Sequence, residues 1–587
     1  MIKPTRLFDY IDKQAIEFPQ EKAISHKHNG KWIHYSSKDF QKNVNEYSLA
    51  LLAHSVGKED KIAIISGNRP EWNFCDNGIL QIGAVNVPIY PTSSINDYEF
   101  ILNNSSVKYL FISDATIYEK ASKVNVPSLK GIYSFEPVTG CKHISEFLDK
   151  ADWSRLEEVE KIKSGIQSKD LATIIYTSGT TGNPKGVMLS HRNIIFNVEE
   201  VSPHLPVEKN HKVLSFLPLC HIFERVVTYF YFYKGVEVYF AESIDTLKEN
   251  IAEVKPHFMT CVPRLMEKIY DGIIAKGHDL KGISKILFYW GINLAHKENA
   301  KTNLFYPLLN KIIFSKFRQA LGGNIVGIVT GAAALQPRIG IFFNNVGITV
   351  REGYGMTETA PVISFNRFGE GENRPGSVGI ILDNIKLKLE HREGMQEDEG
   401  EILVQGDNVM MGYYNNPEAT STTIIDGWLY TGDVGKIEDN KFLKITDRVK
   451  ELFKTSGGKY VAPQHLENTL KESKYIEQIM VIGNNRKFVS ALIYPSQINL
   501  KNWAEFKGLD IDFTKADWTK NSEIQNKIKR VIDRYNVHFN HVEQIKKFTL
   551  VNQEWTIDGG ELTPTLKLKR KVIEAKNQDI IDIMYKI

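Results

Sequence analysis

The stretch Tyr176-Thr-Ser-Gly-Thr-Thr-Gly-Asn-Pro-Lys185-Gly186 decides how the rest of the chain is interpreted. A short apolar run, residues 171–175, precedes it, and a helix-like stretch begins at Asn193. Strand, glycine-rich loop and then helix is an order that presents backbone N–H groups to phosphate. The glycines, hydroxyl groups and lysine of the stretch therefore predict a polyphosphate site made by Thr177, Ser178, Gly179, Thr180, Thr181, Gly182 and Lys185.

Other phosphate-binding loops do not fit this stretch. The Gly-Lys-Ser/Thr ending of a Walker A loop is absent, and no Gly-x-Gly-x-x-Gly occurs here to indicate a dinucleotide site. A short cluster of glycine, serine and threonine alone fits an ordinary surface turn equally well. Support for a nucleotide site must therefore come from other parts of the chain.

Length and composition limit the class of protein. The 587 residues exceed a single core, so at least two domains are expected. The formal net charge of +3 is close to neutral for this length, which argues against nucleic acid as the main partner. The cysteines at 75, 141, 220 and 261 lack metal-ligand spacing, so buried thiols in a reducing compartment are expected rather than zinc or disulfides.

The sequence also bears on localisation. Residues 1–9 lack the apolar core of a signal peptide, and no stretch approaches ~18 uninterrupted apolar residues. We therefore expect a cytoplasmic protein that is soluble or at most peripheral at the inner face of the membrane.

Short β-rich runs alternate with helical ones from Lys61 onward, which predicts βαβ units on parallel sheets. The expected strands are too many for one sheet, so the predicted fold class is α/β with two doubly wound lobes to about residue 370. After that point, residues 385–390 and 401–405 alternate apolar and polar side chains around a charged turn. This pattern predicts a small β subdomain over about 371–448.

A compact α+β unit is expected from residue 449 to 587. A helix opens at Pro463, and an apparent strand pair covers 476–482 and 488–494. The chain is thus predicted to have a large N-terminal domain, 1–448, and a small C-terminal domain, 449–587.

A second motif, Arg351-Glu-Gly-Tyr354-Gly-Met-Thr-Glu358-Thr359, is preceded by Thr330-Gly-Ala-Ala-Ala334. Tyr354 offers a flat face to a purine, and Glu358 offers a hard oxygen ligand for Mg²⁺ beside phosphate. Either segment alone is compatible with a strand end and a satisfied turn. Their occurrence together after the Thr/Gly loop favours a nucleotide site.

Three further segments complete the pattern. Asp433, in Gly427-Trp-Leu-Tyr-Thr-Gly-Asp433, follows a glycine turn and is placed to accept both ribose hydroxyls, although Thr-Gly-Asp alone is a common turn. Gly457-Gly458-Lys459 fits a turn as well as a functional loop. The basic run 560–571 would by itself indicate a solvated tail.

Together these motifs resemble the acyl-adenylate-forming superfamily, and the resemblance covers nearly the whole chain. It implies that the nucleotide is held along the second and third motifs. The adenine site would comprise Gly331, Ala332, Ala333 and Tyr354, and further nucleotide-binding residues would be Gly353, Gly355 and Met356. Thr357 and Glu358 would lie near the α-phosphate and the metal. Asp433 and Arg448 would lie at the ribose.

The resemblance also implies a mobile C-terminal domain that carries the catalytic lysine. Lys450 matches the hinge of the family, and Gly457, Gly458 and Lys459 match its thiolation loop. Alignment at Thr565 places the catalytic lysine at Lys569. Leu568 stands where many members have glycine, which leaves Lys567 open as the alternative.

Several segments look most like long-chain fatty-acid–CoA ligases, among them Cys261-Val-Pro-Arg264 and Leu562-Thr-Pro-Thr-Leu-Lys-Leu-Lys569. The implied reaction uses ATP and Mg²⁺ to convert a fatty acid to acyl-AMP and then transfers the acyl group to CoA. A fatty acyl-AMP ligase serving a carrier protein, and a CoA ligase for medium-chain or aromatic acids, stay open as alternatives. The implied catalytic residues are Thr177, Lys185, His221, Glu358 and Lys569.

Two predictions concern the surroundings of the acyl site. His221 is expected to wall and orient the substrate carboxylate, although a lone histidine after an apolar run also fits a core position. Arg225 stands where some relatives have a tryptophan gate, so no such gate is expected. The aromatic run 226–233 is expected in the core or beside an acyl tunnel.

The insert 283–321 mixes aromatic and basic residues. Peripheral membrane contact through a surface helix fits this pattern, and so does packing on the protein's own core. The oligomeric state is not fixed by the sequence, and a homodimer stays open.

Overall fold

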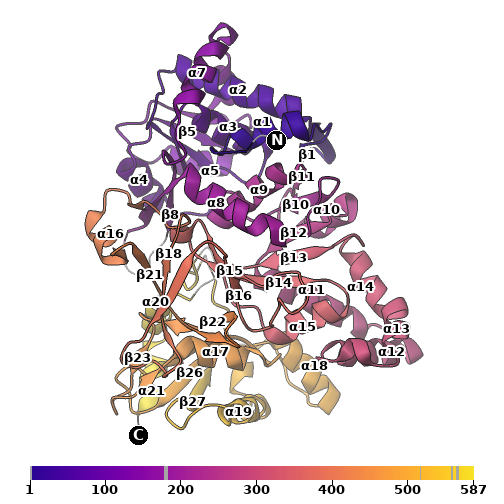
Figure 1. The fold of residues 1–587 in the computed structure, drawn as a ribbon. Helices are drawn as coiled ribbons and strands as arrows, with labels where there is room; N and C mark the ends of the chain where they lie inside the picture. Colours follow the sequence, from indigo (N-terminus) through magenta and orange to yellow (C-terminus); the bar gives the residue numbers. More distant parts are fainter. Residues whose placement is uncertain (1–2, 178–182, 516, 557–558, 564–567, 587) are drawn as a thin grey trace.

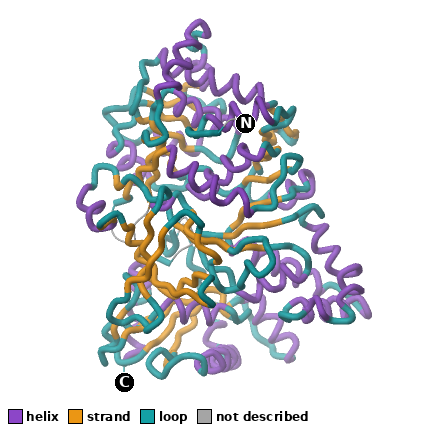
Figure 2. The backbone as a smooth tube through the Cα atoms, viewed as in Figure 1, coloured by secondary structure: helices purple, strands orange, loops and turns teal. Residues whose placement is uncertain are grey.

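The computed structural model describes residues 3–177, 183–515, 517–556, 559–563 and 568–586. Figure 1 shows a first lobe at the top, a second lobe and a β subdomain in the middle, and the C-terminal domain below. Figure 2 shows the strands as the inner layers, with helices on the outside of both lobes. The predicted α/β class is confirmed.

The first lobe contains a sheet of eight strands within the described residues. Its strands, in spatial order, are β19 (Gly412–Tyr413), β9 (Lys185–Ser190), β8 (Leu171–Thr177), β4 (Val85–Ile89), β3 (Lys61–Ile65), β5 (Tyr109–Ile112), β6 (Gly131–Ser134) and β7 (Lys142–His143). From β4 to β7 the strands are parallel, as the βαβ pattern predicts. The helices of this lobe include α2 (Ser37–Ala53), α3 (Pro70–Gln81), α4 (Ile95–Asn104) and α5 (Ala115–Ala121).

The second lobe is built on parallel strands that begin with the N-terminal segment of the chain. In spatial order they are β1 (Ile24–His28), β11 (Glu237–Phe240), β10 (Lys212–Ser215), β12 (Phe258–Cys261), β13 (Gly327–Thr330) and β14 (Val350–Gly355). An antiparallel strand, β2 (Lys31–Tyr35), adds to β1 at the edge. The sequence pattern did not predict this N-terminal hairpin, because its pairing with β11 joins residues more than two hundred positions apart.

The β subdomain continues from the second lobe without a break. β14 pairs parallel with β13 on one side and antiparallel with β15 (Val362–Phe365) on the other. The antiparallel strands that follow are β16 (Gly379–Ile381), β22 (Phe442–Arg448), β21 (Trp428–Glu438), β18 (Gly400–Gln405) and β17 (Lys386–Glu390). Antiparallel pairing therefore starts before residue 371, and β14 is shared by both regions.

The C-terminal domain has its own three-stranded sheet in the described residues, with β25 (Ile476–Ile482), β26 (Val489–Pro495) and β27 (Ile545–Leu550) in that order. The predicted helix at Pro463 is α17 (Pro463–Lys471), and the predicted strand pair is β25 with β26. The other helices are α18 (Gln497–Lys507), α19 (Ser522–Asn536), α20 (Arg570–Lys576) and α21 (Gln578–Tyr585). A boundary between residues 448 and 449 stays our proposal.

Helix α9 (Ile222–Lys234) lies in the large core of the N-terminal domain. Tyr229, Phe230, Tyr231 and Phe232 are buried there, so the predicted core position of this aromatic run is confirmed. Within the part of the chain that the structure describes, no helix is both long and apolar enough to cross a membrane.

Candidate active site

The strands on either side of the Thr/Gly loop, β8 and β9, are neighbours in one sheet. β8 and β9 pair antiparallel, with Thr177 opposite Lys185. Helix α8 (His191–Val201) begins only after β9, and Ser190 caps it by accepting from the backbone N–H of Asn193. The predicted order of strand, loop and helix is therefore wrong: a strand intervenes, and the N-terminus of the helix is not at the loop. Of the predicted loop residues, Ser178, Gly179, Thr180, Thr181 and Gly182 lie outside the described residues.

Lys185 and Glu358 are brought together by a residue that the sequence did not single out, Tyr413. The Tyr413 hydroxyl donates to Oε1 of Glu358 at 2.8 Å. The Nζ of Lys185 lies 4.8 Å from the centroid of the Tyr413 ring. Tyr413 reaches this place because β19 pairs with β9. The tyrosine thus joins the two predicted phosphate-site and metal-site residues.

The environment of Glu358 makes its charge depend on these neighbours. Burial is the largest influence and raises the pKa of Glu358, while the hydrogen bond from Tyr413 lowers it. The charge of Asp433 also raises this pKa, and the charge of Lys185 lowers it. Residues predicted from two other motifs, Lys185 and Asp433, therefore both influence the charge of Glu358.

The turn that carries Glu358 requires glycine at position 355. A Cβ at Gly355 would lie 1.8 Å from the carbonyl oxygen of Pro361. The same oxygen accepts from the backbone N–H of Met356 at 3.0 Å, which closes the turn around Thr357 and Glu358. The glycine thus lets the chain fold back tightly at the end of β14.

Asp433 and Arg448 face each other across β21 and β22, as the predicted ribose site requires. Nε of Arg448 donates to Oδ1 of Asp433 at 2.9 Å, and the hydroxyl of Tyr354 donates to Oδ2 at 2.8 Å. Burial, and then the Asp433 charge, raises the pKa of the Tyr354 hydroxyl well above its usual range, so this group stays a donor. Because each carboxylate oxygen accepts more than one hydrogen bond, Asp433 keeps the capacity to accept hydroxyl groups.

The predicted adenine segment lies against β14. A Cβ at Gly331 would be 3.5 Å from the carbonyl oxygen of Gly353 and 3.6 Å from the ring of Phe223. The next residue, Ala332, has a positive φ of 70°. The loop is anchored by Glu352, whose buried carboxyl accepts from the backbone N–H of Leu335 at 2.9 Å. Burial raises the pKa of Glu352 to about 8.

His221 caps α9. Its Nδ1 accepts from the backbone N–H of Phe223 at 3.1 Å, and its ring lies edge-on to that of Tyr90 at 6.4 Å. Since Phe223 lies beside Gly331, the start of α9 borders the predicted nucleotide site. The histidine has a structural role in starting the helix, and its predicted role toward the substrate carboxylate stays a proposal.

Arg225 points into the core rather than lining an open channel. It is 1% exposed, and its Nη2 donates to Oδ1 of Asp76 at 2.5 Å. The hydroxyl of Tyr229 donates to the other oxygen of Asp76 at 2.6 Å. This buried ion pair joins α9 to α3.

The predicted thiolation loop and hinge lie in turns at the start of the C-terminal domain. Gly457, Gly458 and Lys459 lie between β23 (Phe453–Lys454) and β24 (Tyr460–Val461). The ring of Tyr460 packs at Gly394 in the β17–β18 turn, where a Cβ would lie 2.4 Å from the ring. Lys450 lies in the turn after β22.

Lys569 precedes α20, and its backbone N–H donates to the carbonyl of Glu561 at 2.7 Å. Among the residues that the structure describes, no hydrogen bond or ion pair joins Lys569 to Glu358 or Asp433. The alternative lysine, Lys567, lies outside the described residues.

Comparisons with known proteins agree with this arrangement. Residues 11–414 match the sequence model for the AMP-binding enzyme family, and residues 451–587 match the model for the AMP-binding enzyme C-terminal domain. A long-chain-fatty-acid–CoA ligase of Mycobacterium bovis is 31% identical over 577 residues, covering 95% of this chain and 93% of that one. Long chain acyl-CoA synthetase 3 of Arabidopsis thaliana is 32% identical over 590 residues, covering 95% of this chain and 88% of that one.

A solved structure shows the same fold. The adenylation domain of a carboxylate reductase from Mycobacterium chelonae superposes with a TM-score of 0.75 at 20% sequence identity. The match covers 99% of this chain and 91% of that one.

Proposed function

The chain belongs to the AMP-binding enzyme family, and from this premise we propose that it is a long-chain fatty-acid–CoA ligase. It converts a fatty acid and ATP to acyl-AMP and pyrophosphate, and then converts acyl-AMP and CoA to acyl-CoA and AMP. The names of the Mycobacterium bovis and Arabidopsis thaliana relatives support this activity. The observation that carries the proposal is a chain of contacts: Tyr413 joins Lys185 to Glu358, and Tyr354, four residues before Glu358, donates to Asp433.

In the first half-reaction a carboxylate oxygen of the fatty acid bonds to the α-phosphorus of ATP. The bond from that phosphorus to the bridging oxygen breaks, and pyrophosphate leaves with the electron pair. Both reactants are anions, so catalysis consists mainly of alignment and charge neutralisation. Lys185 and Thr177, which face each other at the base of the hairpin, are placed to hold the leaving pyrophosphate. No general base is needed, because carboxylic acids are already ionised at neutral pH.

The nucleotide is oriented by groups that already hold one another in place. Tyr354 and Arg448 each donate to Asp433, which fixes its carboxylate to accept the ribose hydroxyls. The predicted adenine segment runs close to β14 at Gly331, where a Cβ would lie 3.5 Å from the carbonyl oxygen of Gly353.

Magnesium fits the donor set at Glu358. Mg²⁺ in proteins is bound through one or two carboxylates together with substrate phosphates and water. Glu358 offers such a carboxylate, buried and held by Tyr413 beside Lys185. When bound there, Mg²⁺ would offset part of the phosphate charge.

The second half-reaction requires a different placement of the C-terminal domain. The CoA thiol loses its proton to solvent, and its sulfur bonds to the acyl carbonyl carbon. The bond from that carbon to the phosphate oxygen breaks, and AMP leaves with the electron pair. We propose that rotation about Lys450 exchanges Lys569 for the Gly457–Gly458–Lys459 loop between the two steps. Among the described residues, no hydrogen bond or ion pair joins Lys569 to Glu358, which is compatible with such a moving domain.

The test is AMP release with CoA across acids from acetate to long-chain fatty acids, with aromatic acids included. We expect the highest kcat/KM for long-chain acids, and a preference for short or aromatic acids would overturn the substrate assignment. Product formation that stops at acyl-AMP when CoA is supplied would instead favour an acyl-AMP ligase.

The lysine assignment is tested separately. Lys569→Ala should abolish ATP–pyrophosphate exchange but keep thioester formation from supplied acyl-AMP. Lys567→Ala tests the alternative, and Lys571→Ala, at an exposed position in α20, is the matched control. Retained exchange in Lys569→Ala would refute the assignment.

A further inference from the structure

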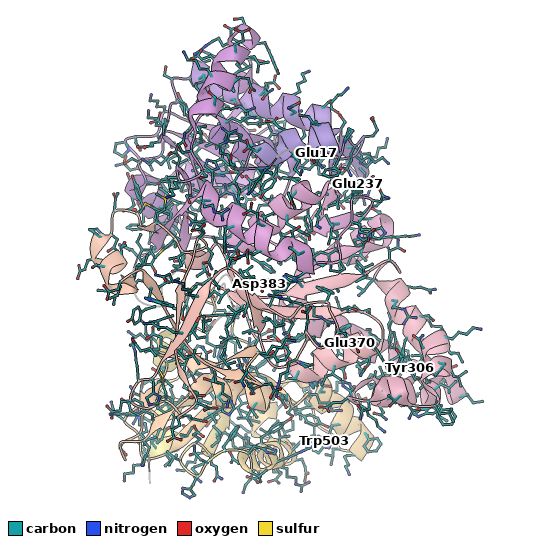
Figure 3. All side chains as sticks on the ribbon, viewed as in Figure 1. Glu17, Glu237, Tyr306, Glu370, Asp383 and Trp503 are labelled. Atoms are coloured by element: carbon teal, nitrogen blue, oxygen red, sulfur yellow. The ribbon has the colours of Figure 1, made fainter. Side chains whose placement is uncertain are left out.

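Asp447 lies where the two domains join, three residues before the proposed hinge at Lys450. It belongs to β22 of the β subdomain, and Figure 1 shows α17 of the C-terminal domain directly below that strand. Figure 3 labels Trp503, which belongs to the same apolar core as the buried residues of α17. Asp447 is only 1% exposed although it carries a carboxyl group. Such a group is buried in proteins where other groups satisfy it.

The carboxyl group of Asp447 caps α17 from the other side of the hinge. Its Oδ2 accepts from the backbone N–H of Gln464, in the first turn of α17, at 3.1 Å. Its Oδ1 accepts from the backbone N–H of Arg448 at 2.6 Å. Helix α17 has no cap of its own, because the residue at its N-cap position, Ala462, has no side-chain acceptor. A residue of the N-terminal domain therefore supplies the hydrogen-bond acceptor that a capping side chain normally supplies.

The predicted catalytic lysine, Lys569, is coupled to the same helix. Arg570, which follows it, donates from Nε to Oε2 of Glu451 at 2.9 Å and from Nη2 to Oε2 of Glu467 at 2.7 Å. Glu467 lies in α17, and its other oxygen accepts from the backbone N–H of Val481 at 2.7 Å. Glu451 comes directly after the hinge. These bonds join the lysine, α17 and the residue after the hinge into one unit, so α17 and Lys569 move together.

We propose that Asp447 is a positioning residue, a clamp that holds the C-terminal domain in this orientation and releases α17 when the domain rotates. The inference rests on the proposed two-step function. Because Asp447 lies before Lys450 and Gln464 lies after it, a rotation that carries α17 away from β22 breaks the bond between them. The clamp therefore affects how the enzyme divides between the orientation for adenylate formation and the orientation for thioester formation.

The protonation of Asp447 supports this role. Its pKa is raised to about 8, chiefly by burial. The backbone N–H of Arg448 lowers this pKa, the charges of Glu451 and Glu467 raise it, and the charge of Arg570 lowers it. After release the carboxyl group meets water, and its pKa returns toward about 3.9. The clamped orientation therefore binds the proton more tightly, so its stability relative to the released orientation falls as the pH rises from about 4 to about 8. A protonated carboxyl group still accepts the helix N–H through its carbonyl oxygen.

Two substitutions weaken the clamp from opposite sides of the hinge. Asp447→Ala removes the acceptor, and Ala462→Ser gives α17 a cap of its own, which favours release from Asp447. Asp447→Ala should shift the ratio of ATP–pyrophosphate exchange to thioester formation from supplied acyl-AMP by about fivefold or more, the effect of one helix cap. Ala462→Ser should shift this ratio in the same direction. Loss of structure does not explain a shared shift, because the serine stabilises the helix.

The matched control removes a helix cap that does not cross the hinge. The side chain of Asn521 caps α19 inside the C-terminal domain, where it accepts from the backbone N–H groups of Glu523 and Ile524. Asn521→Ala should lower thermal stability and leave the ratio of the two half-reactions unchanged.

The ratio should also depend on pH in the wild type. From about pH 6 to about pH 8 it should move in the direction produced by Asp447→Ala, because ionisation of the carboxyl group favours release. Asp447→Asn keeps an oxygen acceptor for α17 but does not titrate, so its ratio should change less over the same range.

Hydrogen exchange at the first turn of α17 tests the bond without any activity. Asp447→Ala should speed exchange of the Gln464 backbone N–H by about fivefold or more, and Asn521→Ala should not. Unchanged hydrogen exchange in Asp447→Ala would overturn the proposal. So would an unchanged ratio in both Asp447→Ala and Ala462→Ser, shifts in opposite directions, or an equal shift in Asn521→Ala. If hydrogen exchange behaves as expected while the wild type forms neither acyl-AMP nor acyl-CoA, the proposed function fails and the bond across the hinge stands.

Discussion

The hydroxyl of Tyr413 is the single atom whose removal tests the site most directly. Tyr413 and Glu358 are 7% and 8% exposed, and the 2.8 Å hydrogen bond between them is therefore shielded from water. A hydrogen bond to a charged group contributes about 1.5–3 kcal/mol. If Glu358 acts in adenylate formation, Tyr413→Phe should lower the kcat/KM for that step by about 10- to 150-fold.

The same substitution has a pH signature. Burial raises the pKa of Glu358, and the Tyr413 hydrogen bond lowers it. Losing the hydroxyl must therefore raise this pKa further. Because the ionised carboxylate is the form that holds a metal, activity should rise with pH through the Glu358 pKa, and in Tyr413→Phe this rise should move to higher pH. The phenylalanine ring keeps the packing against Lys185, so the change isolates the hydroxyl.

The assay is ATP–pyrophosphate exchange as a function of pH, at saturating and at low Mg·ATP. Tyr414→Phe is the matched control, because it removes the neighbouring hydroxyl and leaves the bond between Tyr413 and Glu358 intact. An unchanged exchange rate and pH profile in Tyr413→Phe would refute the role given to this tyrosine. An equal loss in Tyr414→Phe would attribute the effect to local packing instead.

Three other substitutions follow from the geometry. Gly355→Ala should abolish ATP–pyrophosphate exchange, because its Cβ would lie 1.8 Å from the carbonyl oxygen of Pro361. Gly272→Ala is the control and should keep the exchange activity, because a Cβ there would have no atom within 4 Å. Asp76→Ala should lower the free energy of unfolding by about 3–5 kcal/mol, because Arg225 would remain charged and buried without its partner. In thermal denaturation, adding Arg225→Met should restore much of this loss, because it removes the unpaired charge. Arg264→Ala removes the 2.5 Å ion pair between the N-terminal domain and Glu477 of the C-terminal domain. It should change the ratio of the rate of ATP–pyrophosphate exchange to the rate of thioester formation, without destabilising either domain.

The sequence predicts this site best where the residues that interact lie close together along the chain. Asp433 and Arg448 lie fifteen positions apart and face each other on adjacent strands of a hairpin, so the two residues that the resemblance pairs are neighbours in the structure. Their role at the ribose stays a prediction. Gly355 was predicted as a nucleotide-binding residue, and the structure adds a steric reason, the carbonyl of Pro361, for a glycine there. Turns and hairpins of this kind are encoded by glycine positions and by alternation of polar and apolar residues.

The parts that the sequence did not predict depend on distant pairing. Tyr413 has no motif of its own, and its role follows only from the pairing of β19 with β9, more than two hundred residues earlier. The strand β9 was missed because the glycines and hydroxyl groups before it and the helix after it suggested a loop leading directly into a helix. The apolar and basic composition of residues 283–321 was recognised, but which side chains face solvent is decided by tertiary packing.

The hairpin changes the physical account of the phosphate loop. Strand β9 separates helix α8 from the loop, so the positive charge that the described residues place beside the loop is that of Lys185 rather than the dipole of α8. The segment 410–414 then holds the two sides of the site at a constant spacing. The backbone N–H of Met410 donates to the carbonyl of Glu358, and the backbone N–H of Tyr414 donates to the carbonyl of Gly186. Because this segment bonds to both lobes, it connects Lys185 and Glu358 without any contribution from the C-terminal domain. The proposed rotation of that domain would therefore leave the predicted phosphate site in place.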